Sequence, residues 1–106
     1  MLQLVFDNAA GNRTGMALLN ASLADEPPVT SRFQELVLVV RDDLGRWIET
    51  RQFPLRPGRH EAFMLADEIP TTVGRRGTIE IHGAGPIGGV SLRISAQEIF
   101  VLLPTI

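Results

Sequence analysis

The sequence predicts an all-β protein, an immunoglobulin-like antiparallel β-sandwich of about seven strands in a single domain over residues 1–106. Short segments rich in Val, Leu and Ile recur at intervals of roughly 8–15 residues, and Gly, Pro, Asn and Asp separate nearly all of them. Helical periodicity is confined to one short segment. The chain has no cysteine, so the disulfide of antibody domains is absent and the likeness is one of architecture. A barrel or a jelly roll is the alternative arrangement of the same strands.

In the first half of the chain we expect strands at Leu2–Phe6, Gly15–Asn20 and Phe33–Arg41, the last of them the richest in Val and Leu. The long segment Ala21–Ser31 contains adjacent acidic residues and prolines and therefore reads as a loop. Asp42-Asp43-Leu44-Gly45 predicts a turn, because Asp bonds its own backbone and Gly takes a positive φ.

After that turn, Trp47–Leu55 is expected to return antiparallel, at a sheet edge or a bulge because it contains Pro54. Arg56-Pro57-Gly58-Arg59 predicts a second turn. The segment Glu61–Ile69 places Ala62, Leu65, Ala66 and Ile69 on one stripe, which predicts a short helix that ends at Pro70.

The last third of the chain contains three further expected strands, Gly77–His82, Gly89–Ser95 and Glu98–Leu103. Gly83-Ala84-Gly85-Pro86-Ile87-Gly88 matches G-x-G-x-x-G, the pattern of a dinucleotide-binding turn. That site requires a helix after the turn, whereas the following residues alternate as a strand. We therefore interpret the motif as a glycine-rich turn between antiparallel strands.

Composition excludes several classes of function. The net charge is −2 with both signs interspersed, so no basic surface for nucleic acid is expected. The longest apolar runs, Leu36–Val40 and Ile99–Leu103, are far too short to span a membrane. No basic segment precedes an apolar one at the N-terminus, so we expect no signal peptide here and treat the chain as a domain excised from a longer one.

Catalytic and metal sites are also not expected. Gly89-Val90-Ser91 starts like a nucleophile elbow, but Arg93 replaces the second glycine and Ser91 lies in mid-strand. Two isolated histidines give no zinc spacing, and the acidic pairs do not alternate as in a calcium loop. We predict a protein that is not an enzyme, with no cofactor; a calcium ion held between separate loops is the remaining alternative.

The least ordinary feature is that two strands are apolar on both faces. If Leu36, Leu38 and Val40 point inward, the residues between them point outward, and the same holds for the last strand. In an immunoglobulin-like topology the third, sixth and seventh strands share a sheet, so we expect one apolar outer patch, which marks an interface. The candidate interface comprises Val37, Val39, Ser91, Arg93, Ile99, Val101 and Leu103. The alternative is that Ala21–Arg32 or Glu61–Ile69 folds over this face.

A second hypothesis is a ligand-binding module for a glycan or a peptide. Trp47 is the one tryptophan and there is no tyrosine, so it is the single candidate for stacking on a sugar. The arginines of two loops, Arg56 and Arg59 in one and Arg75 and Arg76 in the other, would assist if the loops meet. A core or edge-packing role is the alternative for Trp47.

A resemblance to a known family follows from several of these segments in order. They resemble a repeated Ig-like β-sandwich module of large bacterial surface or secreted proteins over about four-fifths of the chain. The segments are Gly15–Asn20, Leu36–Asp42 with Gly45, Leu55–His60, Phe63–Pro70, Arg76–Ile81 and Val90–Arg93. The resemblance implies a structural or protein-interaction module on the cell surface or outside the cell. Its expected partners are proteins, either neighbouring domains or a second copy, and it implies no catalytic residues.

Overall fold

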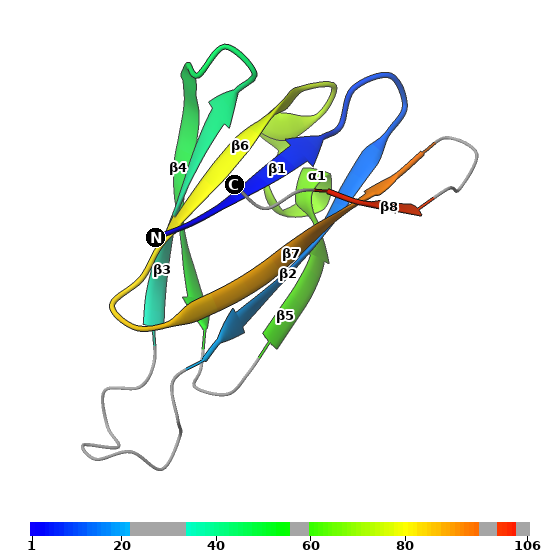
Figure 1. The fold of residues 1–106 in the computed structure, drawn as a ribbon. Helices are drawn as coiled ribbons and strands as arrows, with labels where there is room; N and C mark the ends of the chain where they lie inside the picture. Colours follow the sequence, from blue (N-terminus) through cyan, green and yellow to red (C-terminus); the bar gives the residue numbers. More distant parts are fainter. Residues whose placement is uncertain (22–33, 56–59, 96–99, 104–106) are drawn as a thin grey trace.

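A computed structural model describes residues 1–21, 34–55, 60–95 and 100–103, with the side chains of Gln34 and of 100–102 not described. It confirms an all-β antiparallel sandwich of two layers (Figure 1). One sheet has the strand order β1-β6-β3-β4 and the other β5-β2-β7-β8. The strands are β1 (Leu2–Asp7), β2 (Arg13–Asn20), β3 (Gln34–Asp42), β4 (Trp47–Leu55), β5 (His60–Met64), β6 (Arg76–His82), β7 (Ile87–Ile94) and β8 (Phe100–Leu102).

Two strand pairings agree with the immunoglobulin arrangement, whereas β1 and β7 pair with different neighbours. The second strand pairs with the fifth and the third with the sixth, as in an immunoglobulin domain. The first strand, however, pairs with β6, and β7 pairs with β2 along its whole length. The expectation that the third strand shares a sheet with the last two is therefore wrong, because β3 lies in one sheet and β7 and β8 in the other.

The core lies between the sheets and is built from alternate residues of each strand. Phe6 and Leu4 of β1 and the inward residues of β3 and β6 are almost fully buried. Phe53 and Phe63, from different sheets, lie with ring centroids 5.2 Å apart. The inward residues are Leu4, Phe6, Met16, Leu18, Leu36, Leu38, Val40, Phe53, Leu55, Ile79 and Ile81, joined by Leu65 and Ile69 from the segment after β5.

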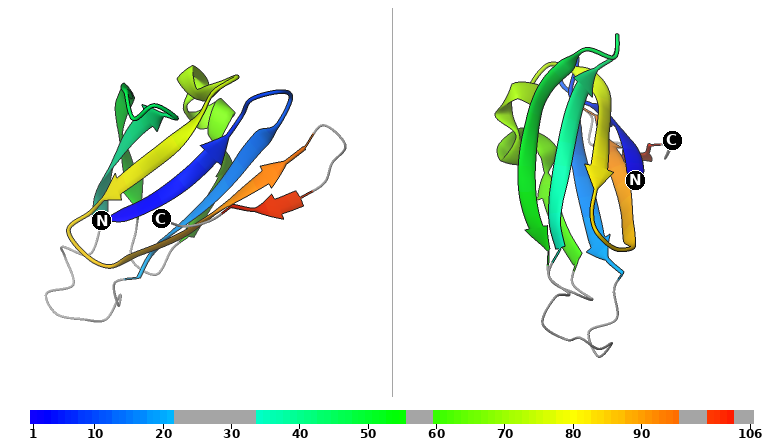
Figure 2. Two further views of the ribbon diagram at one scale, coloured as in Figure 1. Left: turned by 45° about the horizontal axis from the view of Figure 1, so that its top comes forward. Right: turned by 90° about the vertical axis from the view of Figure 1, so that its left-hand side faces the viewer.

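The expected helix over Glu61–Ile69 is shorter than the periodicity indicates. Residues up to Met64 belong to β5, and only α1 (Leu65–Glu68) is helical, followed by the 3-10 turn η2 (Pro70–Thr72). Pairing with β2 over Gly15–Leu19 stabilises these residues more than a helix that could be no longer than about two turns. Figure 2 shows α1 beside β4, at one open side of the sandwich. Arg51 Nη1 donates to the Glu68 carbonyl there at 2.6 Å, so this segment closes the space between β4 and β5.

Buried polar groups fasten the β1–β2 connection to η2. The Thr14 hydroxyl accepts from the Asp7 amide at 2.8 Å and donates to the Asp7 carbonyl at 3.0 Å. The Asn8 side-chain carbonyl accepts from the Thr14 amide at 2.8 Å, and its Nδ2 donates to Thr72 Oγ1 at 3.0 Å. Each of these side chains is nearly inaccessible to solvent, so the network ties the ends of β1 and β2 to the turn that precedes β6.

On the other open side, β1 of one sheet lies close against β7 of the other, a seam visible in Figure 1. Gly89 faces this seam, and a β-carbon added there would lie 3.0 Å from Leu2 Cδ2 and 3.0 Å from Leu18 Cδ2. Ser91, the next inward residue of β7, is fully buried. In the middle of β7 the inward residues are thus the small Gly89 and Ser91, and the bulkier Val90 and Leu92 face outward.

An apolar groove on the outer face of the β5-β2-β7 sheet

Outward side chains of three neighbouring strands form an apolar face. The register places Ala17 of β2 between Ala62 of β5 and Val90 of β7. Two residues earlier on β2, Gly15 lies between Met64 and Leu92. Two residues later, Leu19 lies between His60 and Gly88. Only Arg13, beside Ile94 at one end, carries a full charge on these three strands' outer face. We call this surface the groove face.

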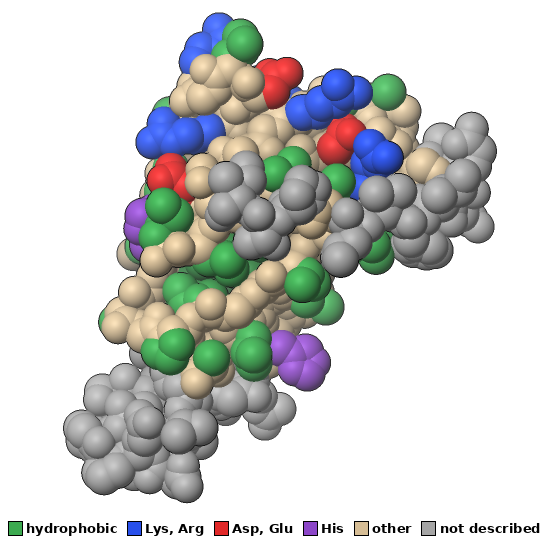
Figure 3. Space-filling view, viewed as in Figure 1, with side chains coloured by type: hydrophobic (Ala, Val, Ile, Leu, Met, Phe, Trp, Pro, Cys, Tyr) green, Lys and Arg blue, Asp and Glu red, His purple; other side chains and the backbone are tan. Residues whose placement is uncertain are grey.

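The groove face is hollow along its middle strand. A hollow of about 500 Å³ is lined by Gly15 and Ala17 as its floor, with Met64 on one wall and Val90 and Leu92 on the other. A smaller hollow of about 240 Å³ continues it past Leu19 and Gly88 to His60. Large apolar side chains here remain accessible: Val90 is 49% and Leu19 39% exposed. In Figure 3 charged side chains gather over the upper half of the molecule, whereas the part over the lower end of β7 shows hydrophobic side chains and a histidine.

The outer face of the other sheet is different in character. Val37 and Val39 of β3 point outward there, as their alternation predicts, and both are half-buried. Their neighbours in register are polar: Val37 lies beside His82 and Gln52, and Val39 beside Glu80 and Thr50. Two valines among such side chains make no contiguous apolar patch.

The sequence-predicted interface is therefore divided between the two sheets. Val37 and Val39 lie on one outer face, whereas Ser91 faces the interior of the sandwich and does not flank a patch as expected. Arg93 is half-buried at the seam, and Leu103 beside it lines a polar hollow. Ile99 and the side chain of Val101 lie outside the described residues. Val37 and Val39 cannot join Ser91 and Arg93 in one surface, because β3 and β7 lie in different sheets.

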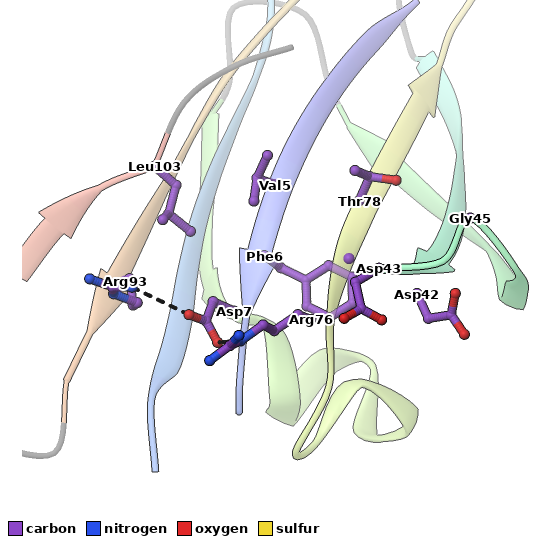
Figure 4. A pocket seen from close by; sticks show the side chains of 11 residues that line it. Val5, Phe6, Asp7, Asp42, Asp43, Gly45, Arg76, Thr78, Arg93 and Leu103 are labelled. Carbon is purple, nitrogen blue, oxygen red and sulfur yellow. Dashed lines mark hydrogen bonds and ion pairs between the residues drawn. The ribbon is translucent and has the colours of Figure 1, made fainter. Parts of the chain in front are cut away.

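The polar hollow has a volume of about 570 Å³ and lies at the ends of β1 and β6 (Figure 4). Asp7 lies between two arginines: its Oδ2 is 3.3 Å from Arg93 Nη1 and its Oδ1 is 3.2 Å from Arg76 Nε. The Ala9 amide also donates to Oδ1, at 3.1 Å. Burial alone raises the pKa of Asp7, but the bonds from Ala9, Arg93 and Arg76 together hold that pKa below its ordinary value. A carboxylate kept ionised by two cations serves as a structural anchor rather than as a proton acceptor.

The β3–β4 turn behaves as its residues predict. Asp42 Oδ1 accepts from the amides of Leu44 and Arg46, each at 2.9 Å, and Gly45 has a φ of 80°. Bonds from the amide and side chain of Arg46 and from the Leu44 amide lower the pKa of Asp42. Within the described residues, no three His, Asp or Glu side chains gather closely enough to hold a metal ion.

Trp47 follows that turn and is 62% exposed, so it is not a core residue. Its Nε1 donates to Thr50 Oγ1 at 2.9 Å, which holds the ring against its own strand. The polar hollow reaches Asp42 and Gly45 but is not lined by Trp47. Of the arginines considered with it, Arg76 pairs with Asp7, and Arg56 and Arg59 lie outside the described residues.

One signal in the sequence does point to the groove face. Val90, Leu92 and Ile94 alternate with Gly89, Ser91 and Arg93, and the alternation is correct. Its expected direction, with Ser91 on the outer face, is wrong. The row Gly15, Ala17 on β2 supplies small residues at the same spacing. Both rows become readable as one surface once β2 and β7 are known to be neighbours.

The fold and this surface define a small all-β sandwich domain with an uncharged hollow on one outer face. No family model, curated protein or solved structure matches the chain. None of the helices in the described part of the chain is long and apolar enough to cross a membrane.

Proposed function

We propose that this domain is a non-catalytic protein-interaction module that binds its partner through the groove face. The observation that supports this most directly is the accessible, nearly uncharged surface around Ala17 and Val90, which a soluble sandwich does not need for folding. Contiguous apolar surface of this kind marks binding sites in soluble proteins. Within the same proposal, the domain belongs to a larger extracellular protein, which the resemblance to modules of bacterial surface or secreted proteins supports.

The test is to select displayed random peptides on the domain and to map where they bind. The variant Val90→Glu with Leu92→Glu puts two charges on the groove face, and we expect selected peptides to lose binding to it. Both side chains point outward, so the free energy of unfolding of the variant should lie within about 1 kcal/mol of the parent's. The matched control, Val37→Glu with Val39→Glu on the other outer face, should bind the peptides unchanged. Equal binding to both variants would exclude the groove face as the site.

A ligand module that stacks a sugar on Trp47 is the second candidate, supported by the exposure of that side chain. Trp47 is the one tryptophan, so intrinsic fluorescence reports on it alone. We expect oligosaccharides to leave its emission unchanged. Saturable quenching by one oligosaccharide, lost in Trp47→Ala, would favour the second candidate.

A further inference from the structure

We infer that the groove face binds one amphipathic α-helix of a protein partner, laid along β2 with its apolar side on Gly15 and Ala17. This inference rests on the proposed function and adds the conformation and chemistry of the partner. It follows from the backbone of β2, from the dimensions of the groove and from the charge at its end.

The backbone of the groove floor excludes an extended peptide. β2 is the middle strand, and it pairs with β5 over Gly15–Leu19 on one side and with β7 over Arg13–Asn20 on the other. Its amides and carbonyls are thereby used in the sheet, so an extended chain lying in the groove would find no backbone partner there. Its peptide groups would be buried without hydrogen-bond partners, and the free energy of desolvating them would exceed the free energy gained by burying its side chains. A helix satisfies its backbone internally and can bury an apolar stripe without that cost.

The width of the groove fits a helix. The walls on β5 and β7 are two strand spacings apart, about 10 Å, which is close to the diameter of a helix with its side chains. The face extends from Arg13 to Leu19, or about 20 Å, the length of roughly thirteen helical residues. At Gly15 and Ala17 the outward residues of the middle strand are smaller than Met64 on one flank and Val90 and Leu92 on the other, so the surface is concave over this part of β2.

The area is too small for a stable pair of identical domains. Three strands over about 20 Å give a footprint of roughly 300 Å², whereas stable protein pairs bury about 800 Å² on each partner. Two copies stacked face to face would also leave both recessed floors unfilled. A single helix fills such a floor.

The charge at one end completes the description of the partner. Arg13 is exposed on the same face beside Ile94, and the described part of the chain shows no ion pair for it. The other residues of the face carry no carboxylate or arginine, and His60 lies at the opposite end. The bound helix therefore carries leucine-like residues at i, i+4, i+7 and i+11 and an acidic residue at the end near Arg13.

The test uses a fluorescein-labelled, hydrocarbon-stapled helix of 14 residues with that pattern of leucines and a terminal glutamate. Two controls accompany it: an unstapled peptide of the same composition with a central proline, and a stapled helix with its leucines scattered around the axis. We measure binding to the intact 106-residue domain by fluorescence polarisation. The patterned helix should bind at least tenfold more tightly than either control.

Variants of the floor residues distinguish binding that depends on the shape of the groove from non-specific adsorption to an apolar surface. Ala17→Leu fills the floor while it increases apolar area, and it should weaken the patterned helix at least tenfold. Gly15→Ala is the milder second variant, because an added β-carbon meets nothing closer than Met64 Sδ at 3.7 Å, and it should weaken binding two- to fivefold. Arg13→Glu should weaken binding by about threefold and remove its salt dependence.

Each contrary result overturns the inference. Equal or tighter binding to Ala17→Leu, with the fold verified by thermal unfolding, would mean that apolar adsorption rather than shape explains binding. Equal binding of the proline-containing peptide would mean that helical conformation is not required. Absence of binding by the patterned helix would also overturn the inference. If displayed peptides still lose binding to Val90→Glu with Leu92→Glu in these cases, the interaction module stands and only the helical partner fails.

Discussion

Gly89 and Leu2, from opposite sheets, lie so close that a β-carbon on the glycine would be 3.0 Å from the leucine Cδ2. The same atom would be 3.2 Å from the carbonyl oxygen of Ala17, which belongs to the backbone and cannot rotate away. The approach of β1 to β7 thus depends on the absence of a side chain, and with it the outward direction of Val90 and Leu92.

We therefore expect Gly89→Ala to lower the free energy of unfolding by about 1–2 kcal/mol, because the seam must widen by a few tenths of an ångström. Gly88→Ala is the matched control in the same strand. Its added β-carbon would lie 3.7 Å from Leu19, an ordinary contact, so it should be neutral or slightly stabilising. Urea denaturation measures both variants. If both lose stability equally, strand glycine as such matters and the seam does not.

The small inward residues in the middle of β7, Gly89 and Ser91, also explain what the sequence could and could not predict. The described strands other than β5, the Asp42–Gly45 turn and the outward direction of Val37 follow from alternation and turn chemistry, which are local. For β5 the helical periodicity of Glu61–Ile69 was misleading, because pairing with β2 is not local. The sheet that β7 joins is not local: it depends on β1 taking the place beside β6, and no residue of β7 alone specifies this. From the sequence alone, either Val90 and Leu92 or Gly89 and Ser91 could face the core. The close approach of β1 decides between them, because only the smaller pair fits beside it.

Ser91 lies in that inward row, and its buried hydroxyl has no hydrogen-bond partner among the described residues. A desolvated hydroxyl without a partner is destabilising. Ser91→Ala should raise the free energy of unfolding by about 1 kcal/mol. The measurement is a shift of the urea midpoint with an unchanged slope. A loss of stability would show that the hydroxyl has a partner in solution.

Thr14 presents the opposite case, because its buried hydroxyl is bonded twice to the backbone of Asp7. Thr14→Val keeps the shape of the side chain but leaves an amide and a carbonyl unpaired, so we expect a loss of about 2 kcal/mol. Thr78→Val on the outer face of β6 is the control, and it should change stability by less than about 0.5 kcal/mol. Thermal unfolding of the three proteins side by side decides the point. Equal effects of the two substitutions would mean that the Thr14 bonds contribute little.

Asp7 should make the stability of the domain sensitive to acid. Its pKa is lowered in the folded protein: burial opposes this, but the bonds from the Ala9 amide, Arg93 and Arg76 outweigh it. A carboxyl with a lowered pKa stabilises the fold at every pH above its unfolded value, about 3.9, and this contribution is lost as the pH falls through the folded value. Stability should therefore decline below about pH 4.

Asp7→Asn removes that titration and the two ion pairs while it keeps the size of the side chain. At pH 7 we expect the variant to be less stable than the parent by about 1 kcal/mol, a modest value because Arg76 is largely exposed. Below pH 4 the difference in stability between the two proteins should shrink, because the parent alone loses the contribution of an ionised Asp7. Asp42 and Glu49, whose pKa values are also lowered, titrate in both proteins and do not affect this difference. Asp67→Asn, on the exposed surface of α1, controls for the loss of one negative charge. The midpoints of urea denaturation between pH 2.5 and pH 7 measure this difference. If the two midpoints stay equally far apart or move further apart in acid, Asp7 stabilises the fold by packing rather than by its charge.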